Sequence, residues 1–173
     1  ADFLFVPQGV SADLIATRNG YTRTDLDALA VESQRRAKRA WDEGRFARSV
    51  VPVLDRNGLT ILDRDEHLRP ESTVESLATL APSFKKLAMV AGFDQVVLHR
   101  YPEIERLEYF HHAGNSSGLV DGAGMVLVGS AEGAKRAGAR PRARIRSVAA
   151  CAGDPTIMLT MPAECCRIAL RKA

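Results

Sequence analysis

The sequence has no long apolar run, and this shortage excludes a class of protein. No stretch approaches the roughly 20 consecutive apolar residues that a membrane-spanning helix needs. The first residues lack the basic start and long apolar stretch of a secretory signal. We therefore expect a protein of the cytoplasm without a membrane partner.

Cysteine is also scarce, with Cys151, Cys165 and Cys166 in 173 residues. An odd number, two of them adjacent in a helical pattern, does not suit a disulfide framework, so a reducing compartment is expected. Cys151 lies in an apolar segment, where cysteine usually acts as a small core residue. We expect none of the three to be a nucleophile.

Neither sign of charge dominates, because 24 Lys and Arg face 21 Asp and Glu, for a net charge of +3. The small excess is concentrated in residues 35–39 and 135–146. Such segments could bind phosphate or nucleic acid, with binding that weakens steeply in salt. A solvated helix face and the outward face of a strand are the simpler explanation, and we expect no nucleic-acid partner.

Hydrophobic residues make up 46% of the chain, which is enough for one packed core without signs of disorder. Five helices are predicted from apolar periodicity, and the clearest begins at Thr22, where Asp25 completes a capping box, and stops at Gly44. Its core-facing stripe would consist of Leu26, Leu29, Ala30, Ser33, Ala37, Ala40 and Trp41. The others are expected over residues 11–17, capped by Ser11; 72–80, capped by Ser72 with Glu75; 130–138, capped by Ser130; and about 163–173.

Strand signals alternate with these helices, which is typical of an α/β protein. Residues 50–53 and 59–62 flank Asp55-Arg56-Asn57-Gly58, which predicts a tight hairpin. Residues 124–128 and 142–149 are predicted as two further strands. The stretch 85–108 has mixed periodicity and is predicted as a loop with a short buried piece. The chain ends inside its last predicted helix without a cap, which is typical of a truncated chain.

The most distinctive segment is the glycine-rich run from His111 to Ala123. Glycines and small hydroxylated residues at this density let backbone and hydrogen-bond donors approach a bulky ligand. Gly114–Gly118 also matches G-x-S-x-G, the nucleophile turn of serine hydrolases, but neither a helix pattern nor a histidine follows it. No ligand set for a metal surrounds His111 and His112, and a histidine with satisfied hydrogen bonds beside the glycine turn is the better prediction.

The sequence of this run, H-H-A-G-N-S-S-G-L-V-D-G-A, resembles the G-N-(A/S)-S-G-x-x-D-G-A signature of the thiolase family. Further segments follow in thiolase order, at residues 5–13, 30–34, 65–69 and 154–158. The similarity therefore extends over nearly the whole chain. It implies a thiolase-like α/β fold with an inserted loop domain that binds coenzyme A and part of the α/β core. The implied units are 1–112 for the loop domain, 113–140 for a strand and helix returning to the N-terminal core half, and 141–173 for the start of the C-terminal core half.

The family's nucleophilic cysteine motif and its N-E-A-F, G-H-P and C-x-G-G-G motifs occur nowhere in these 173 residues. The resemblance therefore implies the central part of a thiolase-type acyltransferase of fatty acid and lipid metabolism, which cleaves or condenses 3-oxoacyl-CoA through a cysteine acyl-enzyme. The segment alone is predicted to be inactive, with no catalytic residue and no prosthetic group. Its ligands are coenzyme A and acyl-CoA, and the complete enzyme is expected to be a homodimer or homotetramer. The alternative is a non-catalytic acyl-CoA-binding or interaction protein derived from a thiolase.

The resemblance also implies contacts with the nucleotide end of coenzyme A. Arg69 falls where the family places an arginine, whose guanidinium suits both phosphate and the adenine face. Ser76 falls where a serine meets the adenine, and Phe84 where an aromatic ring packs against the ligand. Each has a structural alternative, namely a salt bridge from Arg69 to Glu66 or Glu71, a helix-surface serine and a core phenylalanine.

Three more contacts are implied along the rest of the ligand. Ser117 falls on the serine that hydrogen-bonds the pantetheine arm, and Ala113 on the small residue that lets the arm lie against the backbone. Met158 falls where a methionine lines the acyl pocket, with core filling as an equal alternative. Pro7-Gln8 stands where many short-chain members carry His-Met, and the stretch 85–108 is longer than the loop of the simplest members. Both departures leave the acyl preference open.

Overall fold

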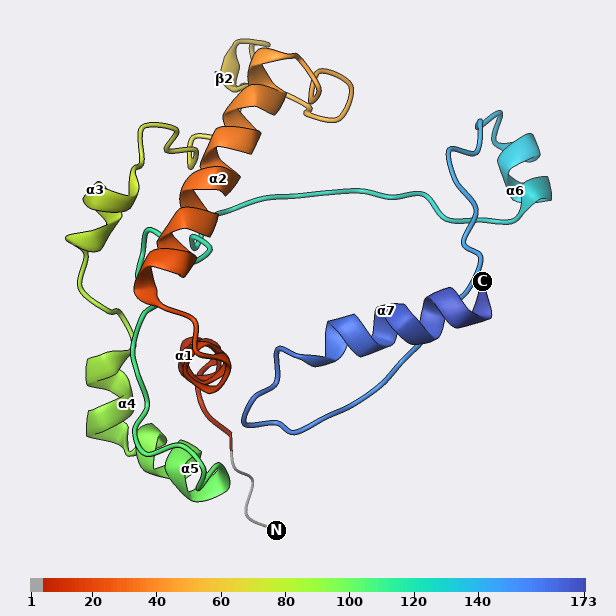
Figure 1. Ribbon diagram of the computed structural model, residues 1–173. Helices are drawn as coiled ribbons and strands as arrows, with labels where there is room; N and C mark the ends of the chain where they lie inside the picture. Colours follow the sequence, from red (N-terminus) through yellow and green to blue (C-terminus); the bar gives the residue numbers. More distant parts are fainter. Residues whose placement is uncertain (1–4) are drawn as a thin grey trace.

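The computed structural model describes residues 5–173 and contains helices and one small sheet (Figure 1). The helices are α1 (Gln8–Asn19), α2 (Arg23–Asp42), α3 (Val74–Ala78), α4 (Lys85–Ala91), α5 (Phe93–Arg100), α6 (Ala131–Arg136) and α7 (Met161–Lys172). The strands are β1 (Val53–Leu54) and β2 (Thr60–Leu62). Residues 1–4, with which the predicted unit 1–112 begins, lie outside the described residues.

Helix α1 begins earlier than predicted. Pro7 stands at its N-cap, and the Pro7 carbonyl accepts hydrogen bonds from the backbone of Val10 and Ser11. Ser11 is therefore not a cap but a buried residue inside the helix, and its Oγ donates to the Thr156 carbonyl at 2.8 Å. Proline suits this start because its fixed φ fits the turn into a helix. Gly20, with φ +70°, ends the helix as a left-handed cap.

Helix α2 confirms the predicted capping box and corrects the predicted stripe. Thr22 Oγ1 accepts from the Asp25 backbone at 3.2 Å, while Asp25 Oδ2 accepts from the Thr22 backbone at 2.8 Å. Leu29, however, is 69% exposed, whereas Asp27 is buried and Gln34 half-buried. The inward face of α2 is therefore polar where it meets the chain that follows α5.

The predicted hairpin is confirmed, but its first strand is Val53–Leu54 and not the predicted 50–53. Strands β1 and β2 pair antiparallel, with Val53 opposite Leu62. Asp55 Oδ1 closes the turn by accepting from the backbone of Asn57 and Leu59, both at 2.8 Å. Gly58 takes the left-handed conformation there, with φ +83°.

The stretch 85–108, predicted as a loop, instead forms helices α4 and α5. Gly92, with φ +72°, ends one helix and precedes the other, so the apolar periodicity is cut into two short runs that each fall below a clear helical signal. The predicted cap of α3 is also wrong by one residue, because Thr73 rather than Ser72 forms the capping box, with Ser76 as its partner.

The core surrounds α1, which packs against α5 (Figure 1). Val6, Val10, Leu14, Ala88, Val97, Tyr101, Leu107 and Ile157 form one buried cluster. Phe84 and Phe93, at the starts of α4 and α5, are half-buried against it. The core therefore joins α1 and Ile157, which precedes α7, to the helices of the 85–108 stretch.

The two stretches predicted as strands, 124–128 and 142–149, are not strands in the part of the chain that the structure describes. Residues 118–130 run out from the α1–α5 region to α6 as an extended segment (Figure 1). Met125 is 96% and Val126 85% exposed. A strand exists only where a neighbour pairs with its backbone, and within residues 5–173 only β1 and β2 do so.

The last two helices agree with prediction. Ser130 caps α6 by accepting from the Gly133 backbone at 3.1 Å, and Gly138 follows in the left-handed conformation. Helix α7 starts two residues before the expected Ala163. Over residues 5–173 no helix is both long and apolar enough to cross a bilayer.

Candidate functional site

The start of the glycine-rich run is a turn whose shape is set by Asn115. Its Oδ1 accepts from the His112 backbone at 2.8 Å, and its Nδ2 donates to the Phe110 carbonyl at 3.2 Å. The Asn115 backbone N–H donates in turn to the His112 carbonyl at 3.1 Å. Because the oxygen and the nitrogen of the side-chain amide are both hydrogen-bonded to the backbone of the turn, Asn115 stabilises its conformation.

His112 is fully buried and hydrogen-bonded at both ring nitrogens. The Gly114 backbone N–H donates to Nδ1 at 3.0 Å, so Nδ1 is the acceptor and Nε2 carries the proton that it donates to Asp27 Oδ1 at 2.8 Å. Asp27 also accepts from Arg23 Nε at 2.8 Å and Asn115 Nδ2 at 2.9 Å. Burial raises the pKa of Asp27, but the hydrogen bonds from His112, Arg23 and Asn115 outweigh it and leave the pKa below its ordinary value.

A second buried aspartate, Asp13 of α1, holds the chain just before the turn. Its Oδ1 accepts from the backbone of Phe110 at 2.9 Å and of His111 at 3.0 Å, and it contacts His111 Nδ1 at 2.7 Å. Its Oδ2 is buried without a hydrogen-bond partner in residues 5–173. Asp13 and Asp27 thus tie the glycine-rich run to α1 and α2.

Two glycines of the run are required by close packing. A Cβ at Gly114 would lie 2.5 Å from Leu77 Cδ2 and 2.9 Å from Leu80 Cδ1. A Cβ at Gly118 would overlap the ring of His67. The run therefore lies directly against α3 and the segment before it, which carry two of the predicted ligand contacts.

Arg69, the first of these, is exposed, and its backbone N–H donates to Gln34 Oε1 of α2 at 2.8 Å. Its Nη1 donates to the carbonyls of Glu66 at 2.6 Å and Leu68 at 2.9 Å. The guanidinium meets the backbone carbonyl of Glu66 and not its carboxylate, and no ion pair in residues 5–173 includes Arg69, so the salt-bridge alternative is wrong. The guanidinium is held at one nitrogen and open at the others.

Ser76 is exposed, and its hydroxyl already serves the cap of α3. Ser76 Oγ donates to the Thr73 carbonyl at 2.9 Å and accepts from the Thr73 backbone N–H at 3.0 Å. A hydroxyl has one proton and two lone pairs, so one acceptor position remains. A ligand therefore meets Ser76 as an acceptor and not as a donor.

The remaining predicted residues are divided between the run and the core. Ala113 and Ser117 are exposed on the run, on either side of the buried turn. Phe84 is half-buried, and its ring lies so close to α1 that a Cβ at Gly9 would overlap it. Met158 is half-buried and has a strained left-handed φ of +29°. The structure thus brings Arg69, Ser76, Ala113 and Ser117 to one region, with Phe84 and Met158 against the core around α1.

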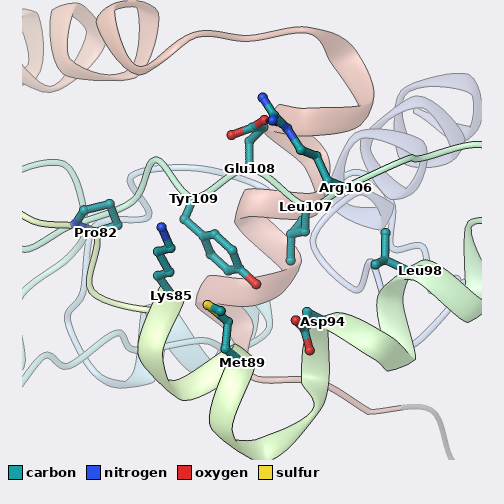
Figure 2. A pocket seen from close by; sticks show the side chains of 9 residues that line it. All are labelled: Pro82, Lys85, Met89, Asp94, Leu98, Arg106, Leu107, Glu108 and Tyr109. Atoms are coloured by element: carbon teal, nitrogen blue, oxygen red, sulfur yellow. Dashed lines mark hydrogen bonds and ion pairs between the residues drawn. The ribbon is translucent and has the colours of Figure 1, made fainter.

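A pocket of about 420 Å³ lies outside this region (Figure 2). Its walls come from α4, α5 and the chain on either side of these helices, at Pro82, Lys85, Met89, Asp94, Leu98, Arg106, Leu107, Glu108 and Tyr109. The ring of Tyr109 lies across its centre, and burial together with Asp94 and Asp13 raises the pKa of Tyr109 to about 12. None of the six predicted ligand contacts lines it. Sequence reasoning missed this pocket because it lies within the stretch taken for a loop.

Comparison with known proteins explains this arrangement. Residues 3–95, more than half of the chain, match the sequence model of the thiolase N-terminal domain. The chain belongs to the thiolase family. The predicted resemblance to the thiolase family is thereby confirmed, and a thiolase-like fold follows.

Three thiolase relatives are similar over almost the whole chain. A beta-ketoadipyl-CoA thiolase of Pseudomonas aeruginosa is 37% identical over 168 residues, which is 96% of this chain and 37% of the relative. An acetyl-CoA acetyltransferase of Paracoccus denitrificans is 37% identical over 167 residues, 95% of this chain and 37% of the relative. A 3-ketoacyl-CoA thiolase of Escherichia coli O1:K1 / APEC is 35% identical over 168 residues, 95% of this chain and 38% of the relative. The chain thus spans just over a third of the length of these relatives.

Sequence reasoning missed the two aspartates that hold the thiolase signature. Asp13 lies three residues after Val10 and next to Leu14, on the buried face of α1, and Asp27 lies four residues after Arg23 on the inward face of α2. A carboxylate at an inward helical position needs a donor, and two adjacent histidines supply two. An inward-facing aspartate on each of two helices, together with two adjacent histidines, was therefore the pattern in the sequence that could have indicated these contacts. In residues 5–173, no cluster of three or more His, Cys, Asp and Glu residues could hold a metal ion.

Proposed function

We propose that this chain is the coenzyme A-binding part of a thiolase-type acyltransferase that cleaves or condenses 3-oxoacyl-CoA. The observation that carries the proposal is the turn at residues 112–118, which Asp27 holds against the segment bearing Arg69 and Ser76. Membership of the thiolase family and the names of the three relatives support the same activity. The coenzyme A-binding unit would comprise residues 1–112 with the turn that follows.

In this proposal, the run holds the pantetheine arm. Ser117 is exposed beside Gly118, and its hydroxyl hydrogen-bonds an amide of the arm. Ala113, also exposed, has too little side chain to hold the arm off the backbone. Since the turn between them is fixed by Asn115 and His112, both contacts are in place before the ligand binds.

The nucleotide end of the ligand lies over the segment before α3 and over α3 itself. The open nitrogens of Arg69 donate to a phosphate, because its Nη1 alone is engaged by carbonyls. The free lone pair of Ser76 accepts from the exocyclic amino group of adenine, the one donor on that edge of the base. Phe84 packs against the ligand between this region and the core, and Met158 lines the acyl end.

The chemistry of a thiolase needs a thiolate, a base and oxyanion donors. The residues of this chain contribute by binding and orienting the thioester, which lowers the entropic cost of its reaction. We propose that the complete protein carries out the acyl transfer, as a homodimer or homotetramer in the cytoplasm.

Calorimetric titration of the full-length protein with coenzyme A tests the binding role. We expect Ser117→Ala to weaken binding about threefold to tenfold and Arg69→Ala about tenfold to a hundredfold, from one neutral and one charge-assisted hydrogen bond. Ser49→Ala and Arg48→Ala are matched controls, since both residues are exposed and remote from the run in sequence. Equal affinity in all four variants would contradict the proposal.

Thiolysis of acetoacetyl-CoA by the full-length protein separates the enzyme from its alternative. Turnover together with coenzyme A binding supports the acyltransferase. Binding without turnover on acetoacetyl-CoA or a longer 3-oxoacyl-CoA supports a non-catalytic acyl-CoA-binding protein derived from a thiolase.

A further inference from the structure

Two of the three cysteines face each other across the C-terminal part of the fold. Cys151 lies in the chain between α6 and α7, and Cys165 lies in the first half of α7. The Cys151 thiol donates to Cys165 Sγ with the sulfur atoms 2.9 Å apart. Cys166 is exposed, so the neighbouring thiol points away from the pair.

Contacts on both sides of the pair hold the chain before Cys151 to α7. Ser147 Oγ donates to the Ala169 carbonyl at 2.6 Å on one side. On the other side, the Cys151 thiol lies 3.5 Å from the Met161 carbonyl. The packing of residues 147–151 against α7 therefore holds the two sulfur atoms opposite each other.

We propose that Cys151 and Cys165 form a site of reversible oxidation, at which a peroxide joins them in a disulfide. A disulfide needs its sulfur atoms about 2.05 Å apart, which a small rotation of either side chain supplies. In this proposal Cys165, which accepts the hydrogen bond of the pair, reacts first, and Cys151 attacks it in the second step. This proposal stands independently of coenzyme A binding.

The reaction balances with hydrogen peroxide as the oxidant. The Cys165 thiolate attacks one peroxide oxygen and the O–O bond breaks. Hydroxide departs as the leaving group, and Cys165 becomes a sulfenic acid. The sulfur of Cys151 then attacks Cys165 Sγ, the S–O bond breaks, and the hydroxyl group leaves with a proton as water. In total the two thiols lose two protons and two electrons, and the peroxide becomes two water molecules.

The same geometry sets the pH dependence of the second step. The hydrogen bond to Cys165 and burial raise the pKa of the Cys151 thiol above its ordinary value of 9.0. Since the thiolate is the attacking form, disulfide formation speeds up as the pH rises and is still rising at pH 9.

The cross-link would close a loop that is already anchored to two helices. Within residues 151–165, Thr156 accepts from Ser11 of α1, and Asp154 accepts from Arg100 Nε at the end of α5 at 2.8 Å. Met158, with its strained φ, lies between these anchors and α7. Oxidation would therefore limit the movement of the loop that carries Met158.

Peptide mapping of the full-length protein tests the proposal. The native protein is treated with hydrogen peroxide, its free thiols are blocked with N-ethylmaleimide in denaturant, and it is digested with trypsin. All three cysteines fall in one tryptic peptide, 147–167, between Arg146 and the cut after Arg167. We expect this peptide to lose two hydrogen atoms and to carry one maleimide, on Cys166. A second cut before Asp154 should leave two pieces that separate only after reduction.

Single substitutions identify the partners. Cys151→Ser and Cys165→Ser should each abolish the cross-link, while Cys166→Ser is the matched control that retains it. A link from Cys151 to Cys166, a link between two chains, or a peptide with three maleimides after peroxide would overturn the proposal. The wild-type map and Cys166→Ser decide the question even if the other two variants fail to fold.

Discussion

At the scale of single residues, Asp27 anchors the start of the glycine-rich run to α2. It is buried on α2, and three donors from three different residues converge on its carboxylate. Two of these donors, His112 Nε2 and Asn115 Nδ2, belong to the turn itself. The turn therefore depends on a charge that lies outside it, and Ser117 takes its position from Asp27.

Replacing that charge should loosen the turn. We expect Asp27→Asn to lower the free energy of unfolding by about 1–3 kcal/mol, because buried donors lose an ionised acceptor. In urea denaturation, the matched control Asp42→Asn should stay within about 0.5 kcal/mol, since Asp42 pairs with Lys38 on the surface. The affinity for coenzyme A should fall with Asp27→Asn and not with Asp42→Asn. A variant as stable and as tight-binding as the wild type would remove Asp27 from this role.

Acid titration of the same variant provides a second readout. The folded pKa of Asp27 lies below its ordinary value of 3.8, so its contribution to stability is present above that pH and is lost as the pH falls through the folded pKa. The difference in stability between wild type and Asp27→Asn should therefore shrink below about pH 3.8. A difference that stays constant into acid would show that the charge on Asp27 is not what holds the turn.

At the scale of elements, the predictions succeeded where the signal is local. The capping box of Thr22 and Asp25, the turn after Asp55 and the cap at Ser130 each lie within a few residues of the element that they define. Short-range hydrogen bonds of this kind leave a visible pattern in the sequence. The roles that the family signature implies for Ser117 and Ala113 stay predictions.

The rest depended on contacts between distant parts of the chain. His112 and Asp27 are 85 residues apart, and Asp13 and His111 are 98 residues apart. Neither contact leaves a trace in the local pattern of apolar and polar residues. Ser11 lies inside α1 and not at its cap, and its hydroxyl donates to the Thr156 carbonyl, 145 residues away. Helices α4 and α5 were missed because each is too short for its period to be counted.

The packing of α1 on α4 gives a test at this scale. We expect Gly9→Ala to destabilise the protein by about 1–3 kcal/mol, because the new methyl group overlaps the ring of Phe84 and the ring must move within the core. Gly133→Ala is the matched control in α6, where the nearest atom is Ser130 Oγ at 3.5 Å. There the gain in helix propensity should stabilise by up to about 1 kcal/mol. Thermal unfolding of both variants decides, and equal shifts would contradict the close packing of Phe84.

At the scale of the whole molecule, the extended segment 118–130, which begins within the glycine-rich run and leads to α6, is the most unusual feature. Leu119, Val120 and Met125 to Val128 are exposed along it, and their backbone groups pair with no strand in residues 5–173. An unpaired apolar segment of this kind is a template for another chain.

Produced as the 173-residue chain alone, the protein should therefore associate with itself as its concentration rises. Static light scattering should show this, and the double substitution Val126→Lys with Val128→Lys should reduce it by placing charge on the segment. Val51→Lys, at another exposed valine, is the matched control and should change little. A chain that stays monomeric at all concentrations would contradict this expectation.

The bond between Ser11 and Thr156 has a consequence in time as well as in space. A ribosome that adds about 5–20 residues per second needs on the order of ten seconds to make the chain between them. During that interval the inward hydroxyl of α1 has only water as its partner, although the helix itself forms in about a microsecond. The sequence of α1 is therefore synthesised long before the helix can complete its packing. A nascent chain that stalls before Thr156 is expected to leave the Ser11 hydroxyl without its native partner in the core.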